Sequence, residues 1–118
     1  MLAQSDERTA NRPTPLECPL GIFLRLLGNK WRALVLWRLS WGAKGYYQLL
    51  RAIDGLTSRR LTQELGDLER AGLITKRSQP GGLGAQYCLT PLGERFKLVL
   101  GSMYLWALQN VPPNSSDS

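Results

Sequence analysis

The side chains best suited to binding chemistry lie in one stretch, residues 55–72. Thr57 is a favourable N-cap and Gly72 is a favourable stop, so the stretch predicts a helix. At about 100° per residue, its leucines fall on one narrow stripe and its cations and amides on the opposite side. The stripe consists of Leu61, Leu65 and Leu68, and the other side of Arg59, Gln63 and Arg70, flanked by Arg60 and Thr62. One side therefore needs a core, and the other is available to a partner.

The first turn of this predicted helix carries an unfavourable charge. Arg59 and Arg60 lie at the positive end of the helix dipole, where each cation costs about 0.3–1 kcal/mol. An anionic partner would reverse that sign, and helix N-termini bind phosphates through their backbone N–H groups. Arginine and glutamine also match the guanine and adenine edges in a major groove. The pattern favours a nucleic-acid contact, and a solvated helix face is the alternative.

The distribution of charge supports the same interpretation. The chain has a net charge of +6, and residues 18–110 carry thirteen Lys and Arg against five Asp and Glu. The excess belongs to the part predicted to fold, as expected of a protein that binds a polyanion. Charge alone also fits an acidic protein partner or an anionic membrane surface.

Several kinds of chemistry have no residues to support them. The 118 residues include no histidine and only two cysteines, which excludes familiar His/Cys zinc sites, Cys-His nucleophiles and Ser-His-Asp triads. The glycine-rich segment 80–84 opens no helix and is not a phosphate-binding loop. No apolar run approaches the roughly 18 residues of a membrane span, and no secretory signal is visible. We expect a cytoplasmic, non-enzymatic protein without metal or cofactor and without a membrane partner.

One cysteine lies where a thiol can be reactive. Cys18 precedes Pro19, which favours the first position of a helix, so Cys18 is the predicted N-cap. Thiols at helix N-termini tend to have a lowered pKa and to react with oxidants or electrophiles. The alternative is a small buried side chain. Cys88 lacks this argument, although its outward direction on a predicted strand could make it a partner thiol.

The elements around residues 57–71 follow from hydrophobic periodicity and turn residues. Helices are predicted over residues 18–27, 30–40, 46–53 and 91–109, and strands over 73–79 and 86–89. Two helices across a short glycine-containing turn form a helix-turn-helix. The polar segments 1–15 and 111–118 predict flexible tails around one domain, residues 16–110. The fold class is mostly α with a small β-hairpin: a winged helix-turn-helix with additional terminal helices.

The last predicted helix has two apolar stripes. One consists of Leu92, Phe96, Val99, Met103 and Trp106, and we expect it to cover the chain's own core. This helix has a second apolar stripe, and the first helix has a second apolar side. Left in water, these would form a large exposed apolar patch of the kind that marks an interface. We expect these residues to form a homodimer contact: Ile22, Leu26, Leu98, Gly101, Leu105 and Leu108. The alternative is that the stripe covers the first helix of the same chain.

Short phrases along the chain resemble one known family. They are Cys18-Pro19; Leu27-Gly28-Asn29-Lys30-Trp31; Tyr46-Tyr47 with Gln48-Leu49; Gly55-Leu56-Thr57; Leu61-Thr62-Gln63-Glu64-Leu65; Leu68-Glu69 with Gly72-Leu73-Ile74; and Tyr87-Cys88-Leu89-Thr90-Pro91-Leu92-Gly93. Their joint order and spacing resemble the HxlR-type winged helix-turn-helix transcriptional regulators. The resemblance implies a homodimer joined through its terminal helices, with residues 57–71 as the recognition helix of each half-site. It also implies repression in most members and, in several, a response to electrophiles or oxidants through a cysteine at the position of Cys18.

The sequence therefore predicts a sequence-specific DNA-binding regulator, a repressor in most such proteins, acting as a homodimer on a pseudo-palindromic operator. Residues expected to reach bases and nearby phosphates are Thr57, Ser58, Arg59, Thr62 and Gln63, and those expected to hold phosphates are Lys44, Tyr46, Tyr47, Arg60, Lys76 and Arg77. The chain departs from the family at Gly45, where a basic residue is usual, and in its uncharged hairpin tip. A winged helix that binds an acidic protein partner is the alternative function.

Overall fold

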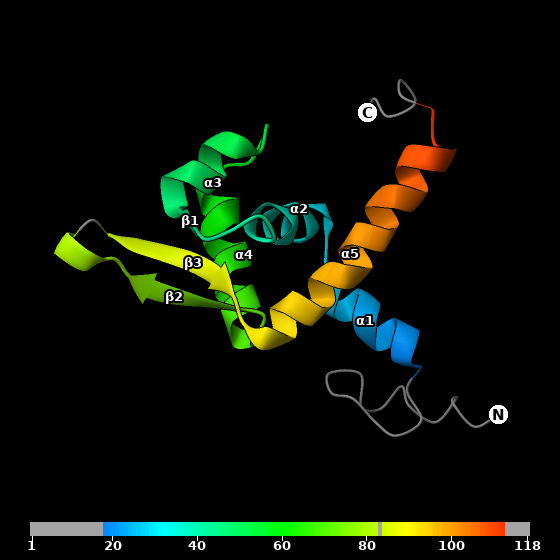
Figure 1. Ribbon diagram of the computed structural model, residues 1–118, viewed down its shortest axis with the longest axis horizontal. Coiled ribbons are helices and arrows are strands. Elements are labelled where there is room, and N and C mark those ends of the chain that lie inside the picture. Colours follow the sequence, from blue (N-terminus) through cyan, green and yellow to red (C-terminus); the bar gives the residue numbers. More distant parts are fainter. Residues whose placement is uncertain (1–17, 83, 113–118) are drawn as a thin grey trace.

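The computed structural model describes residues 18–82 and 84–112, so the predicted tails at 1–15 and from 113 onward lie outside the described residues. Figure 1 shows a helical domain with a β-hairpin extending from one side. In chain order its elements are α1 (Pro19–Leu27), α2 (Lys30–Leu39), β1 (Lys44–Gly45), α3 (Tyr46–Ala52), α4 (Ser58–Arg70), β2 (Ile74–Ser78), a 3₁₀ turn (Pro80–Gly82), β3 (Ala85–Leu89) and α5 (Pro91–Asn110). The predicted winged helix-turn-helix with terminal helices is confirmed.

The sheet is antiparallel, with strand order β1-β3-β2. Tyr87 of β3 lies between Lys76 of β2 and Lys44 of β1, and Gln86 lies between Arg77 and Gly45. Side chains alternate between the two faces of a sheet. Lys76 and Arg77 therefore project from opposite faces of the hairpin, although they are neighbours in the sequence.

The core forms where α4 lies against α2 and α3. The predicted stripe of α4 is buried, and it packs with the buried side chains of α2 and α3. These core side chains are Leu61, Leu65 and Leu68 of α4, Val35, Leu36 and Leu39 of α2, and Leu49 of α3. Burial of this stripe leaves the opposite face of α4 to the outside.

Local signals in the sequence fix the helix ends. The side chain of Thr57 accepts a hydrogen bond from the Arg60 backbone N–H at 3.1 Å, as its N-cap position predicts. Asn29 and Thr90 cap α2 and α5 in the same way. Gly72 follows α4 with a φ of +79°, a conformation that favours glycine.

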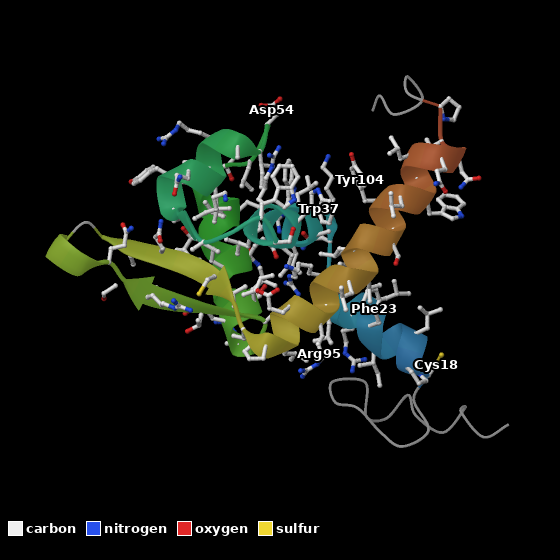
Figure 2. The ribbon with its side chains drawn as sticks, viewed as in Figure 1. Cys18, Phe23, Trp37, Asp54, Arg95 and Tyr104 are labelled. Carbon is white, nitrogen blue, oxygen red and sulfur yellow. The ribbon has the colours of Figure 1, made fainter. Side chains whose placement is uncertain are left out.

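The core-facing stripe of α5 differs from the predicted one. Leu92, Val99, Met103 and Trp106 are 44, 42, 45 and 64% exposed, and only Phe96 of the predicted stripe is buried. The side that meets the core consists instead of Gly93, Phe96 and Leu100, continued by Tyr104, whose ring stacks on Trp37 at 5.2 Å (Figure 2).

The start of α5 explains this rotation. The Thr90 backbone N–H donates to the Leu73 carbonyl at 3.0 Å, and the Thr90 hydroxyl donates to the Gly72 carbonyl at 2.6 Å. These bonds press the first turn of α5 against the end of α4. A Cβ added to Gly93 would lie 2.2 Å from the Leu73 carbonyl oxygen. The smallest residue must therefore face inward, and the residues that follow it at helical spacing face inward too.

Helix α1 contacts the chain's own core through one side only. The ring of Phe23 (Figure 2) lies 4.8 Å from that of Phe96, and Leu26 and Leu27 pack against the core. This contact leaves exposed the three leucines of α5 that belong to the second stripe: Leu98, Leu105 and Leu108. In Figure 1 the last turns of α5, beyond the contact of Tyr104 with Trp37, stand clear of the other elements, and the three leucines remain exposed within the described residues.

We predict that Gly93→Ala destabilises the domain, because the new methyl group would meet backbone rather than a side chain that can move. The expected loss in the free energy of unfolding is about 2 kcal/mol or more, as for an overpacked core. Urea unfolding measures it. Gly21→Ala is the matched control, since nothing lies within 4 Å of its added Cβ. That variant should be neutral or gain up to about 1 kcal/mol, and an equal loss in both would contradict the argument.

Candidate nucleic-acid interface

The outer face of α4 presents the side chains predicted to reach DNA bases. Thr57, Ser58, Arg59, Thr62 and Gln63 are all exposed. Within the described residues, Arg59 has no ion pair and its side chain has no hydrogen bond. Its guanidinium is therefore available at the N-terminal end of the helix, next to the capped first turn.

Arg60 has a different environment from its neighbour. Its Nη1 donates to Glu64 Oε2 at 3.2 Å, one turn along the same helix, and its side chain is 42% exposed. The charge of Arg60 is thus partly balanced within the protein. Of the two arginines in the first turn, Arg59 is therefore the one whose charge is not balanced by the described residues and is available to an external anion.

A buried carboxylate holds α4 in place. Glu64 is fully buried and accepts hydrogen bonds from Asn29 Nδ2 at 3.0 Å, Arg32 Nε at 2.8 Å and Arg60 Nη1 at 3.2 Å. Burial alone raises the pKa of Glu64, but the hydrogen bonds from Arg32, Asn29 and Arg60 outweigh it and lower the pKa below its usual value. The side chain is therefore a buried anion, and both of its carboxylate oxygens accept hydrogen bonds.

Arg32 extends this contact to both neighbouring helices. Its Nη2 donates to Asp67 Oδ2 at 2.7 Å, and its Nη1 donates to the Leu26 carbonyl at 3.4 Å, at the end of α1. A Cβ on Gly28 would lie 2.7–2.9 Å from the guanidinium, so the glycine leaves room for it. Sequence reasoning missed this cluster. The signal available was the pair Glu64 and Asp67, spaced three apart on the inner side of α4.

The first two residues of α3 are tyrosines, and they lie beside the start of α4. The Tyr46 hydroxyl is 2.9 Å from the Ser58 carbonyl oxygen and 2.9 Å from Thr62 Oγ1. Tyr47 is largely exposed, and its ring meets that of Tyr46 edge to face at 5.1 Å. Lys44 Nζ lies 3.4 Å from the Gly42 carbonyl. The structure thus brings the predicted residues of α3 and α4 together on one side.

The hairpin contributes cations on both of its faces. Lys76 and Arg77 are exposed, and Lys76 Nζ lies 5.8 Å from the centre of the Tyr87 ring. A hollow of about 440 Å³ separates α3 from the hairpin tip, and its lining includes Tyr47, Arg51 and Gln86. Arg51 is a further exposed cation that sequence reasoning did not select, because its only signal was a charge on a predicted helix.

Comparison with known proteins identifies the family. A family model described as HxlR-like helix-turn-helix matches residues 26–115 of this chain. The chain belongs to the HxlR-like helix-turn-helix family. Among its relatives is the regulatory protein MalR of Fusobacterium mortiferum, 30% identical over 84% of this chain and 95% of MalR.

Solved structures agree with this assignment. The chain resembles a MarR-family transcriptional regulator from Porphyromonas gingivalis W83, with 29% identity, a TM-score of 0.75, and 85% of this chain and 99% of that one covered. It also resembles the reduced form of the transcriptional regulator YodB from B. subtilis, with 26% identity, a TM-score of 0.70, and coverage of 82% and 97%. Diamide-treated and quinone-bound forms of YodB match as well. This HxlR-like protein is therefore a helix-turn-helix transcriptional regulator by family, and its relatives are regulators rather than enzymes.

The two cysteines of this HxlR-like protein are both free thiols. Cys18 is exposed at the outer end of α1, where it is the N-cap without a side-chain hydrogen bond (Figure 2). Cys88 is half-buried in β3, and β3 and α1 lie on opposite sides of the domain in Figure 1. The described residues hold no metal-binding group of His, Cys, Asp and Glu, and none of their helices has the length and apolar character to cross a membrane.

The Glu64 cluster predicts a loss of stability in acid. A carboxyl whose pKa is lower in the folded state stabilises that state above the unfolded pKa and loses the contribution as pH falls through the folded pKa. The free energy of unfolding should therefore fall below about pH 5. In Glu64→Gln this part of the pH dependence should vanish, and stability at neutral pH should drop by about 3–5 kcal/mol because Arg32 loses its charged acceptor.

Denaturant unfolding at a series of pH values measures both effects. Glu69→Gln is the control, since Glu69 is exposed on the same helix and makes no ion pair within the described residues. A Glu64→Gln protein that kept the wild-type pH profile would show that the cluster does not carry the acid sensitivity.

Proposed function

We propose that this protein is a sequence-specific DNA-binding transcriptional regulator, a repressor that acts as a homodimer on a pseudo-palindromic operator. The observation that carries the proposal is the division of α4 into two faces. One face buries its leucines completely, and the other exposes Arg59 and Gln63 beside the first turn. A helix held in this way can enter a major groove without reorganising the core.

The roles of the exposed side chains follow from their chemistry. Arg59 and Gln63 have the donor and acceptor geometry to read base edges. The cations around them, on β1, α3 and the hairpin, would hold phosphates and set the register on the duplex. These are Lys44, Arg51, Lys76 and Arg77, with Tyr47 beside them. Lys76 and Arg77 project from opposite faces of the hairpin. We therefore expect only one of the two side chains to reach any one strand of the DNA.

The homodimer rests on the uncovered surface of α5. Leu98, Leu105 and Leu108 are each more than half exposed, on a 20-residue helix whose last turns stand clear of the other elements. Patches of this kind usually mark an interface. A second copy is the occupant we propose, because two recognition helices at a fixed separation are what a pseudo-palindrome requires. Ile22 and Gly101 complete the proposed contact, whereas Leu26, which the sequence also predicted for it, packs against the chain's own core.

A response to oxidants or electrophiles is the regulatory part of the proposal. Cys18 is exposed at one end of α1, and the other end of α1 is tied to α4 through Arg32. Modification of the thiol would therefore act on a helix that adjoins both the proposed dimer contact and the recognition helix. The resemblance to diamide-treated and quinone-bound YodB supports the choice of these reagents.

Selection from a random pool of DNA duplexes tests the function as a whole. The expected result is a pseudo-palindrome whose half-site spacing reports the geometry of the dimer, with weaker recovery after diamide treatment. Failure to bind any duplex even at low salt would overturn the proposal. That result would favour the alternative, a winged helix that binds an acidic protein partner.

Arg59→Ala should relax the base preference at one position in each half-site and weaken operator binding by about 1–3 kcal/mol. Because Arg59 has no partner within the described residues, the variant should keep its stability. Arg77→Ala is the contrast: it should weaken all duplexes alike and flatten the salt dependence. Binding titrations against the operator and single-base variants separate the two patterns, and an unchanged preference in Arg59→Ala would exclude the assigned role.

Cys18→Ser should abolish the loss of DNA binding caused by diamide or a quinone, while binding by the untreated protein stays at the wild-type level. The reason is that Cys18 is the exposed thiol and Cys88 is half-buried in the sheet. Cys88→Ser is the matched control and should respond like wild type. Operator titration before and after treatment measures both, and a response lost only in Cys88→Ser would assign the sensing to the strand thiol instead.

A further inference from the structure

The Tyr46 hydroxyl makes two contacts with the first turns of the recognition helix. It is 2.9 Å from the carbonyl oxygen of Ser58, the first residue of α4, and 2.9 Å from Thr62 Oγ1, one turn later. Tyr46 itself opens α3, on the other side of the helix-turn-helix turn. One phenol group therefore joins the start of α3 to the start of α4.

The direction of these hydrogen bonds is set by the number of protons. A carbonyl oxygen can only accept, so the single phenolic proton goes to Ser58. The Thr62 hydroxyl must then donate to the Tyr46 oxygen. With its proton used in this way, Thr62 cannot also donate to a phosphate, which only accepts. Tyr46 is likewise left without a proton for a phosphate, the contact that the sequence predicted for both.

The position of Tyr46 is fixed from its own side. The Gly45 backbone N–H donates a hydrogen bond to Gln48 Oε1 at 2.7 Å, and Gly45 pairs with Gln86 in the sheet. The Tyr46 ring also packs against the core. Ser58 and Thr62 flank Arg59 and Gln63 along the helix. A tether at Ser58 and Thr62 thus controls the rotation of the turn that carries the proposed base-reading side chains.

We propose that Tyr46 is a positioning residue for sequence recognition: its hydroxyl orients the first turns of α4 so that Arg59 and Gln63 meet their bases. This inference rests on the proposed function. It assigns the hydroxyl to specificity rather than to affinity, since its bonds join two parts of the protein and use the proton that a phosphate contact would need. The hydroxyl and the ring have separate roles, so removing the hydroxyl alone leaves the packing in place.

Tyr46→Phe tests the proposal, with binding to the selected operator and to random duplex measured over a range of salt. We expect the ratio of operator to random affinity to fall by at least about three- to tenfold, since the variant loses two hydrogen bonds and the loss of one corresponds to that range. The slope of log K against log[salt] should stay at its wild-type value, and the melting temperature should fall by no more than about 4–8 °C. Amide hydrogen exchange in the first turn of α4, measured without DNA, should become faster.

Two further variants sharpen the result. Tyr47→Phe removes an exposed hydroxyl proposed to hold a phosphate, and it should weaken operator and random duplex alike. Thr62→Val removes the other end of the tether, and its effect on the ratio should not add to that of Tyr46→Phe. An unchanged ratio in Tyr46→Phe, or equal weakening on all duplexes with a flatter salt slope, would overturn the inference while leaving the proposed function intact. If the wild type selects no operator, the proposed function fails, and unchanged amide exchange in Tyr46→Phe would then reject the tether itself.

Discussion

The carboxylate of Glu64 is the constraint on which the position of the recognition helix depends. A buried anion is costly unless donors surround it, and here the donors come from three places: the turn between α1 and α2, α2, and α4 itself. Rotation or sliding of α4 would separate Glu64 from Asn29 and Arg32 together. The leucine stripe on the same helix could tolerate a small slide, because apolar contact is not directional. The ion cluster therefore specifies where α4 lies, and the leucines supply most of the reason it stays buried.

A second fixed point lies at the other end of α4. Thr90 bonds to the carbonyls of Gly72 and Leu73, and Gly93 comes close to the same backbone, so the exit from α4 and the entry to α5 form one rigid junction. Glu64 and Asp67 hold the middle of α4 through Arg32, and this junction holds its end. The hairpin of β2 and β3 begins after Leu73 and ends before Thr90, which are the two residues that this junction joins. Covalent and hydrogen-bonded connections, rather than a flexible linker, therefore place its cations relative to the outer face of α4.

The sequence predicted what depends on local periodicity and capping, and it missed what depends on long-range contact. Thr57 and the leucines of α4 were placed correctly because caps and a 3.6-residue period are local properties. The core stripe of α5 was wrong because apolar residues line this helix on several sides, and the deciding contact is that of Gly93 with Leu73, twenty residues earlier. The Glu64 cluster was missed for a similar reason, since Arg32 and Glu64 are 32 residues apart. The predicted DNA contacts remain predictions, and the structure adds that Arg60, Tyr46 and Thr62 already have partners within the protein.

The charge of the recognition helix also shows why counting residues is not enough. Between Ser58 and Arg70, α4 has three arginines and three acids, so the helix is formally neutral. Its acids, however, do not face the same way as its free cation. Glu64 and Asp67 are directed to Arg32, and Asp67 also pairs with Arg70, while Glu69 lies at the far end of the helix. This arrangement leaves Arg59 at the N-terminal turn without a neighbouring carboxylate to neutralise it. The helix is neutral in total but positive at its N-terminal end because Glu64 and Asp67 are directed inward to Arg32. The ion pairs that fix the position of α4 therefore also keep these two carboxylates away from its outer face.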